Sequence, residues 1–152
     1  MTPEETLAKL GHPLPTPARP VAAYVPTVRA GDLVFVAGQL PFVDGKLPTT
    51  GRVGESVTLE QAQQMARAAA VNALAALKAE VGELSRVKRL VRVGAFVASA
   101  NDFTDQPKVA NGASELLLQA FGEKGRHARA AVGVNVLPLG APVEVELLAQ
   151  IE

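Results

Sequence analysis

The chain has 152 residues, and its 15 lysines and arginines balance 15 aspartates and glutamates to a formal net charge of zero. We expect residues 1–152 to form a single domain, because this length supports one hydrophobic core. The balanced charge provides no overall field to attract RNA, DNA or anionic lipid, so nucleic acid is not an expected partner. Apolar residues make up 48% of the chain and aromatic residues 4%, which indicates a core of small and branched aliphatic side chains.

The residue types that the sequence lacks exclude several kinds of site. Cysteine is absent, and the two histidines, His12 and His127, are far apart and have no second ligand close in sequence. The chain therefore offers no disulfide, no cysteine nucleophile and no recognisable metal site. It also contains no phosphate-binding loop and no dinucleotide fingerprint. No apolar run suits a membrane span or a signal peptide, so we expect a cytoplasmic protein without a membrane partner.

The first 21 residues predict a short helix followed by an extended strap. Thr2 and Glu5 form a capping-box pattern, and Pro3 suits a first helical turn. This pattern predicts a helix over residues 3–10. The strap follows from prolines that cannot donate ladder hydrogen bonds, which are Pro13, Pro15, Pro17 and Pro20.

The next segment has the pattern of antiparallel strands. Two β-rich runs within residues 22–37 flank a turn at 29–32, where Gly31 permits a tight reversal, so we predict a hairpin. An Asp-Gly pair predicts a smaller hairpin over residues 42–47.

The rest of the chain alternates between helical and strand periodicity. Thr58 and Gln61 repeat the capping-box pattern at the start of a long amphipathic segment. The predicted elements are helices over 58–81 and 108–121 and strands over 87–98, 130–136 and 143–149. A turn at 138–142 predicts that the last two strands form a hairpin. This order predicts an α+β fold with two helices on one face of a sheet.

Isolated polar residues are the candidates for chemistry. Arg129 precedes an uncharged strand, where its guanidinium offers a planar fork of donors for one carboxylate. The alternative is a strand-end arginine that is solvated or paired with a surface acid. Glu144 and Glu146 either carry chemistry or mark the solvent side of an amphipathic strand. Tyr24 is the only phenol, and its alternative role is a half-buried aromatic with its hydroxyl at the rim.

Several segments occur in the order and approximate spacing of the reactive-intermediate deaminase family, also called YjgF or Rid. They are Tyr24–Val25, 33–41, 101–103, 128–132, 137–138 and 143–146. The most specific part is an arginine, a Leu-Pro pair eight residues later and then Val-Glu-Val-Glu. The chain is most similar to a longer branch, often labelled as endoribonucleases, in which Gly-Arg-His-Ala-Arg precedes the strand. The resemblance covers nearly the whole chain from about residue 22.

The resemblance implies a chorismate-mutase-like fold with a mixed sheet, a homotrimer and clefts between subunits. It also implies hydrolysis of 2-imino or enamine acids to 2-keto acids and ammonia, with no cofactor and no metal. The bound partner would be the small 2-imino or 2-keto acid. In family members with this activity, the arginine that matches Arg129 holds the substrate carboxylate, and the acid that matches Glu144 orders the attacking water.

The same resemblance assigns further residues to the cleft. Tyr24 and the backbone at Gly38 line it, while Ala37 and Ala131 stand where many deaminases carry a hydroxyl or a thiol. Asn111 is the nearest counterpart of a helix asparagine that contacts substrate. Two alternative functions stay open. The first is a non-catalytic trimer that binds small carboxylates or acts as a regulator, and the second is an endoribonuclease.

The predicted hairpin separates Arg129 from Glu144. In that register Glu144 pairs with Val136, which is seven residues from Arg129. At ~3.3 Å per residue, the two backbones lie roughly 23 Å apart, too far for one small substrate to contact both. We therefore expect each cleft to take Arg129 and Glu144 from different subunits.

Overall fold

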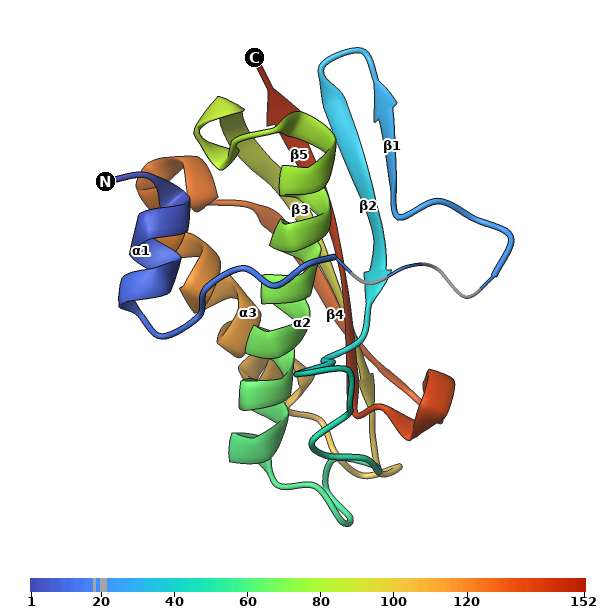
Figure 1. Cartoon of the computed structure of the whole chain (residues 1–152). Helices are drawn as coiled ribbons and strands as arrows, with labels where there is room; N and C mark the ends of the chain where they lie inside the picture. Colours follow the sequence, from blue (N-terminus) through green and yellow to red (C-terminus); the bar gives the residue numbers. More distant parts are fainter. Residues whose placement is uncertain (18, 20–21) are drawn as a thin grey trace.

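The computed structural model describes residues 1–17, 19 and 22–152. Figure 1 shows a single sheet with helices packed against one of its faces. In chain order the elements are α1 (Pro3–Lys9), β1 (Thr27–Ala30), β2 (Leu33–Gln39), α2 (Leu59–Val81), η1 (Leu84–Arg86), β3 (Val87–Ala98), α3 (Gln106–Phe121), η2 (Gly122–Gly125), β4 (Ala128–Val134), η3 (Pro138–Gly140) and β5 (Val143–Ile151). None of the helices in these described residues is long and apolar enough to cross a membrane.

Side-chain caps fix where the first two helices begin. At α1 the Oγ1 atom of Thr2 accepts a 3.1 Å hydrogen bond from the backbone of Glu5, whose carboxylate accepts one of 2.8 Å from the backbone of Thr2. Thr58 and Gln61 form the same reciprocal box at α2. Because these caps satisfy otherwise free N–H groups, the predicted starts of both helices are confirmed. The third helix begins two residues earlier than predicted, at Gln106.

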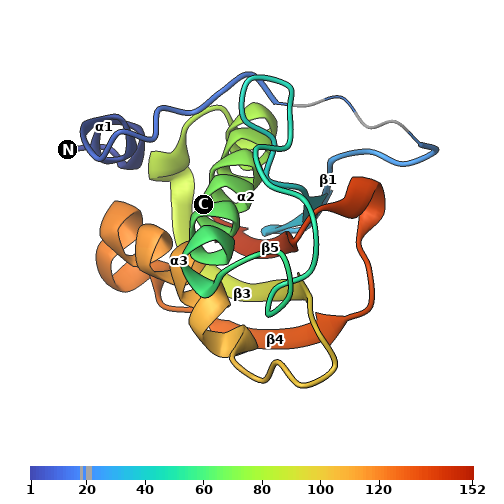
Figure 2. The same cartoon turned by 90° about the horizontal axis from the view of Figure 1, so that it is seen from below.

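The five strands lie in the order β1-β2-β5-β3-β4. β3 and β4 are parallel, and the other neighbouring strands are antiparallel. α2 and α3 lie on the same face of this sheet (Figure 2). The predicted α+β architecture, with two helices on one face of a mixed sheet, is confirmed. Fully buried side chains between these layers include Val34, Leu74, Leu90, Leu116 and Leu117.

The predicted hairpin between the last two strands is wrong. β3 lies between β4 and β5, so Glu144 pairs with Phe96 of β3 and not with Val136. The cause is the helix between β3 and β4, because a strand, a crossover helix and a second strand form a parallel pair. This pairing leaves β4 at the edge of the sheet. Residues 135–142 then cross the end of β3 and lead into β5 on its other side.

The first strand is shorter than predicted. β1 begins at Thr27 and not at residue 22. Pro26 has no backbone N–H to donate, so it contributes only its carbonyl oxygen, which accepts from Ala37 at 2.9 Å, and the regular strand starts with the residue that follows it. Tyr24 therefore lies in the loop before β1, and the prediction that it belongs to the first strand is wrong.

The predicted strap and the predicted small hairpin both lie in the N-terminal half of the chain. Residues 12–17 form no helix or strand, as expected for the strap, and Leu14 packs against the core. Pro20 of the predicted strap lies outside the described residues. The small hairpin predicted over 42–47 is reduced to one bridge around its Asp-Gly turn.

The sheet has one face covered by helices and one face that we call the open face. Along β5, Val143, Val145 and Leu147 are buried on the covered face, while Glu144 and Glu146 alternate with them and point to the open face. The open face also carries apolar side chains that are about half exposed, which are Val28, Phe35 and Val132. An isolated chain thus leaves apolar sheet surface in water.

Candidate functional site

Arg129 of β4 directs its guanidinium to the covered face, toward α3. It is in register with Val93, whose side chain is fully buried on that face. Nη1 of Arg129 donates to Oδ1 of Asn111 at 2.8 Å and to Oγ of Ser114 at 3.2 Å. Nη2 donates to the carbonyl oxygen of Pro107 at 3.3 Å. The structure therefore brings together two of the predicted site residues, Arg129 and Asn111.

A histidine extends this group of hydrogen bonds. Nδ1 of His127 lies 2.6 Å from the carbonyl oxygen of Gly125, and Nε2 lies 2.9 Å from Oγ of Ser114. A carbonyl oxygen can only accept, so in the neutral ring Nδ1 carries the proton and Nε2 is the acceptor. The hydroxyl of Ser114 therefore donates to His127 and accepts from Arg129.

Arg129 has no acidic partner in the described part of the chain. The ion pairs found there use other basic residues. The hydrogen bonds of Arg129 reach an amide, a hydroxyl and a carbonyl oxygen, and none of these groups carries a charge. A partly buried guanidinium with neutral partners keeps its affinity for an anion, and its planar fork matches a carboxylate. Carboxylate binding is thus the chemistry that this end of the site can perform.

A pocket of about 350 Å³ contains three other predicted site residues, Tyr24, Gly38 and Glu144. It lies between the loop before β1, the end of β2 and the segment from η3 to β5. Tyr24 is 51% exposed, so its phenol stands at the mouth of the pocket and not in the core. Apolar side chains form much of the wall, and they are Leu40, Phe42, Pro138 and Leu139.

Glu144 is held against the backbone of a neighbouring strand. The register of β2 against β5 shifts between Val36 and Gln39, and this bulge places Gly38 beside Glu144. A Cβ atom at position 38 would lie 2.9 Å from Cδ of Glu144, so glycine leaves the room that the carboxyl group occupies. Burial raises the pKa of Glu144 above its usual value, and the charge of Glu146 adds to this shift. A pKa closer to neutral suits a group that exchanges protons during a reaction.

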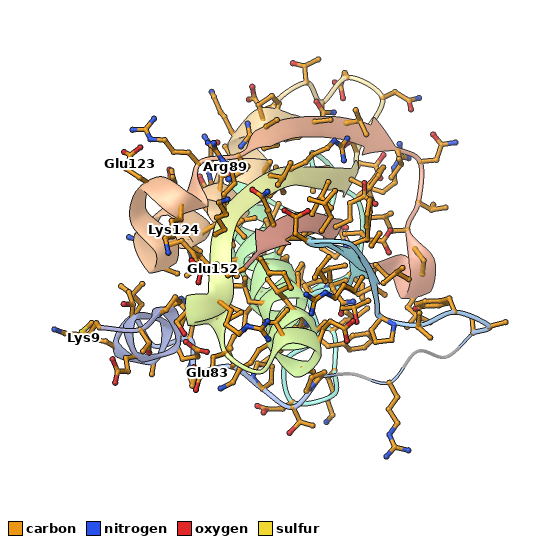
Figure 3. All side chains as sticks on the ribbon, turned by 90° about the horizontal axis from the view of Figure 1, so that it is seen from above. Lys9, Glu83, Arg89, Glu123, Lys124 and Glu152 are labelled. Carbon is orange, nitrogen blue, oxygen red and sulfur yellow. The ribbon has the colours of Figure 1, made fainter. Side chains whose placement is uncertain are left out.

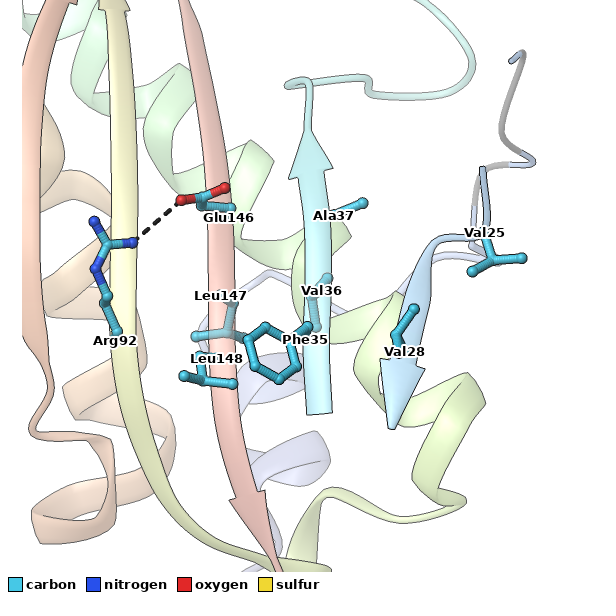
Figure 4. A pocket seen from close by; sticks show the side chains of 9 residues that line it. All are labelled: Val25, Val28, Phe35, Val36, Ala37, Arg92, Glu146, Leu147 and Leu148. Carbon is cyan, nitrogen blue, oxygen red and sulfur yellow. Dashed lines mark hydrogen bonds and ion pairs between the residues drawn. The ribbon is translucent and has the colours of Figure 1, made fainter. Parts of the chain in front are cut away.

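Ala37 faces a different pocket, of about 370 Å³, on the open face (Figure 4). In that pocket Nη1 of Arg92 and Oε1 of Glu146 form an ion pair of 3.2 Å. Within one chain, Ala37 therefore lines a different pocket from Glu144 on the same side of the sheet, although the two belong to the same predicted site. The other walls of this pocket are apolar and include Val25, Val28, Phe35 and Leu148.

The predicted site residues fall into two groups on opposite faces of the sheet. At the β4 edge of the covered face the group is Arg129, Asn111 and Ala131, and on the side of Glu144 it is Tyr24, Gly38, Ala37 and Glu144. Arg129 pairs with Val93 of β3, and the side chain of Val93 points to the helices. Glu144 pairs with Phe96 of β3, and the side chain of Phe96 points away from the helices. The sheet itself separates the two groups, so one chain cannot bring both to one small ligand.

Neither group contains a cluster of metal ligands. No three His, Cys, Asp or Glu side chains among the described residues are arranged to hold a metal ion. His127 is engaged through both ring nitrogens. Burial lowers the pKa of His12, and the positive charge of Arg67 adds to this effect, which favours a neutral imidazole there.

Sequence reasoning gave no role to His127 and also missed Ser114 and Asn72, two further polar residues that support the site. Ser114 lies one helical turn after Asn111, so the two share a side of α3, and this spacing is the signal that could have found it. Asn72 interrupts an apolar stretch of α2, and its Nδ2 donates to the carbonyl oxygens of Leu40 at 2.9 Å and Phe42 at 3.0 Å. Asn72 thereby ties the wall of the Glu144 pocket to the helix.

Comparison with known protein sequences points to one family. Residues 4–151 match the family described as "YjgF/chorismate mutase-like, putative endoribonuclease". The chain is 47% identical to Protein TCP17 of Trypanosoma cruzi over 146 residues, which cover 95% of this chain and 91% of that protein. It is 32% identical to a RutC family protein of Sinorhizobium fredii, over 83% of this chain and 85% of that one.

Solved structures share the fold. A crystal structure of an Agrobacterium tumefaciens protein with unknown function is 44% identical, with a TM-score of 0.94 over 99% of this chain and 92% of that chain. A Shewanella oneidensis protein described as a "putative endoribonuclease" is 36% identical, with a TM-score of 0.96 over 99% of this chain and 100% of that chain. The YjgF gene product of Escherichia coli, at 24% identity, has a TM-score of 0.64 over 89% and 93% of the two chains and shows the fold alone. The chain therefore belongs to the YjgF/chorismate mutase-like family, as the order of its sequence segments predicted.

Proposed function

We propose that the protein hydrolyses reactive 2-imino and enamine acids to 2-keto acids and ammonia. The observation that carries the proposal is the contrast between the two site groups. One presents an arginine without an acidic partner among the described residues, and the other presents a carboxyl group with a raised pKa. The first suits a substrate carboxylate and the second suits a reacting water. Membership of a family that includes deaminases supports the reaction class.

The proposed reaction needs one water molecule and no redox step. Arg129 binds the carboxylate and so fixes the position of the imine carbon. Glu144, as a carboxylate, takes a proton from water while the water oxygen bonds to C2 of the protonated imine. Glu144 then returns the proton to nitrogen, and the C–N bond breaks with its electron pair on ammonia. The hydroxyl group releases its proton to solvent and becomes the keto oxygen. An enamine first takes a proton from solvent at C3 and so becomes the protonated imine.

In this proposal each complete cleft takes its two groups from two chains of a homotrimer in the cytoplasm. The separation of Arg129 and Glu144 by the sheet supports two contributing chains. The apolar side chains on the open face also support assembly, because a second copy would remove them from water. We expected different subunits to supply Arg129 and Glu144 because of the hairpin register, which is wrong. The proposal now rests on the positions of the two residues on opposite faces of the sheet.

A non-catalytic binder of small carboxylates is the second candidate function. Ala131 favours it, because a methyl group stands where the family resemblance places a hydroxyl or thiol in many deaminases. Such a binder would keep the carboxylate fork of Arg129 and would show no turnover.

An endoribonuclease is less well supported, although the family description includes that word. RNA binding relies on a basic surface that follows the phosphates. The chain has no net charge, and basic and acidic side chains are mixed at the end of the molecule in Figure 3. The labelled residues there are Lys9, Glu83, Arg89, Glu123, Lys124 and Glu152.

To test the proposal, an L-amino-acid oxidase generates an imine in situ, and release of the 2-keto acid is followed over time. We expect wild-type protein to accelerate release and Arg129→Ala to lower kcat/KM by about 100-fold, because a charged partner of the substrate is lost. Glu144→Ala should lower kcat by a similar factor. The deaminase proposal is overturned for the tested imines if traces with and without wild-type protein coincide. Pyruvate binding that depends on Arg129, without any turnover, would then favour the binder.

Subunit sharing has its own test. Arg129→Ala and Glu144→Ala chains, mixed under exchange conditions, form some clefts that inherit both native residues. We expect such mixtures to recover activity that neither variant shows alone. Mixtures that stay inactive after proven exchange would contradict the division of each cleft between chains.

A further inference from the structure

We propose that Ser114 and His127 are positioning residues that hold the guanidinium of Arg129 in one orientation. The proposal deepens the function proposed above, since it concerns how the carboxylate-binding arginine is aimed. It begins from an unbroken series of hydrogen bonds, from the carbonyl oxygen of Gly125 through His127 and Ser114 to Arg129.

Each hydrogen bond in this series fixes the direction of the next. The carbonyl oxygen of Gly125 accepts from Nδ1 of His127, which leaves Nε2 as an acceptor in the neutral ring. Nε2 takes the single hydroxyl proton of Ser114. The lone pairs of the Ser114 oxygen therefore face Nη1 of Arg129, which is 3.2 Å away.

Burial argues that Ser114 acts through Arg129 and not on a substrate. A serine beside a histidine resembles the start of a nucleophilic pair, but Ser114 is only 8% exposed, on the helix face that packs toward the sheet. Its hydroxyl already donates to one neighbour and accepts from another, so it has no free proton to offer a ligand. Orientation of the arginine is the role that these contacts fit.

The other partners of Arg129 do not fix its orientation equally well. Asn111 has a side-chain amide at the end of a rotatable bond, and Pro107 accepts only through its backbone at 3.3 Å. Ser114 is different, because His127 ties it to the η2 turn that leads into β4. The same short segment thus carries both the arginine and the residue that secures its partner.

The test uses variants at both ends of the series, with a matched control. Ser114→Ala removes the acceptor next to Arg129, and His127→Leu removes the acceptor for Ser114. His127→Gln keeps an acceptor at nearly the same reach and serves as the conservative rescue. Ser99→Ala is the control, because Ser99 is also buried, at 6% exposed, and its hydroxyl hydrogen-bonds to Val97 and Gln106 instead of Arg129.

We expect Ser114→Ala and His127→Leu to raise KM for the imine about five- to tenfold with kcat within about twofold, since one hydrogen bond to the anchor is lost. His127→Gln should stay close to wild type, as should Ser99→Ala. In an Arg129→Ala background, Ser114→Ala should cause no further rise in KM, because the residue it positions is absent. Equal rises with and without Arg129 would overturn the proposal.

A spectroscopic measurement decides the proposal without any turnover. In protein with ¹⁵N-labelled arginine and no substrate, the guanidinium of Arg129, assigned by its loss in Arg129→Ala, should rotate slowly in wild type and faster in Ser114→Ala and His127→Leu. Unchanged rotation in both variants would overturn the positioning role. A wild type that shows slow rotation but no hydrolysis would refute the proposed function alone. If His127→Leu does not fold, the rotation rate measured in Ser114→Ala decides the proposal.

Discussion

The close contact between Glu144 and the backbone of Gly38 makes position 38 sensitive to any added side chain. A Cβ atom there would lie 2.9 Å from Cδ of Glu144 and push the carboxyl group out of its place in the pocket. We expect Gly38→Ala to lower kcat about tenfold in the imine assay, because a displaced acid–base group transfers protons less well.

Gly94 provides a matched control for that change. A Cβ atom at position 94 would lie 2.6 Å from Oε1 of Glu146, so Gly94→Ala disturbs the neighbouring glutamate in the same way. We expect Gly94→Ala to keep most of the wild-type kcat. Equal losses in the two variants would contradict a special role for Glu144.

The raised pKa of Glu144 predicts how stability depends on pH. Because the pKa is higher in the folded than in the unfolded chain, the folded state holds the proton more tightly. The contribution of this group to stability is therefore complete below the ordinary value of 4.5 and is lost as the pH rises through the raised value. Glu144→Gln, which stays uncharged, should gain in melting temperature relative to wild type between pH 4 and pH 7.

The control for this pH dependence is Glu115→Gln at an exposed position of α3. Its melting temperature should follow that of wild type across the same range. A constant difference between Glu144→Gln and wild type at every pH would show that the carboxyl group is not destabilised by its surroundings.

At the scale of elements, α2 and α3 approach each other closely at Gly112. A Cβ atom at this position would collide with the backbone carbonyl oxygen of Gln63 in α2. We expect Gly112→Ala to lower the free energy of unfolding by about 1–3 kcal/mol, because backbone cannot move aside as a flexible side chain can. Denaturant titration measures this, with Gln119→Ala on the exposed side of α3 as the control. Similar midpoints for the two variants would show that the helices can separate at little cost.

Helix starts could be predicted from short sequence patterns, but the pairing of strands in the sheet could not be predicted in the same way. The capping boxes at Thr2 and Thr58 mark helix starts within four residues of sequence, so the sequence alone locates them. The neighbours of a strand depend on the whole sheet, and the hairpin prediction took the nearest strand in sequence as the partner. The helix predicted over 108–121 was the overlooked signal, because a helix between two strands favours a parallel crossover and so places β4 beside β3.

The candidate site shows the same limit. Arg129 and Glu144 were identified because their spacing along the sequence matches a family pattern. Their positions on opposite faces could not be read from that spacing, since the face depends on the register with β3. Ser114 gains its role only when α3 packs over β4, so its spacing of three residues from Asn111 was the one signal that the sequence offered.

For the whole molecule, the exposed apolar side chains of the open face predict assembly. Phe35 lies on this face with 48% of its surface exposed, level with Leu148 of β5. We expect Phe35→Lys to give smaller particles than the wild type in light scattering, because a charge would be placed in a contact that excludes water. Circular dichroism should show that the fold is kept.

Leu118→Lys is the control for assembly, because Leu118 is 40% exposed but lies on α3, away from the open face. It should keep the wild-type particle size. A wild type that is monomeric at micromolar concentration would contradict both the homotrimer and the shared clefts.

The central place of β5 has a consequence for how the chain folds. β5 is the last strand in chain order, yet it lies between β2 and β3 and is the strand through which the two sides of the sheet are joined. Leu33 pairs with Gln150, 117 positions further along the chain. Pairing over such distances closes large loops and slows folding. We therefore expect the β1–β2 hairpin and the β3–α3–β4 unit to stay unpaired with each other during synthesis, until residues 143–151 have left the ribosome and can join them.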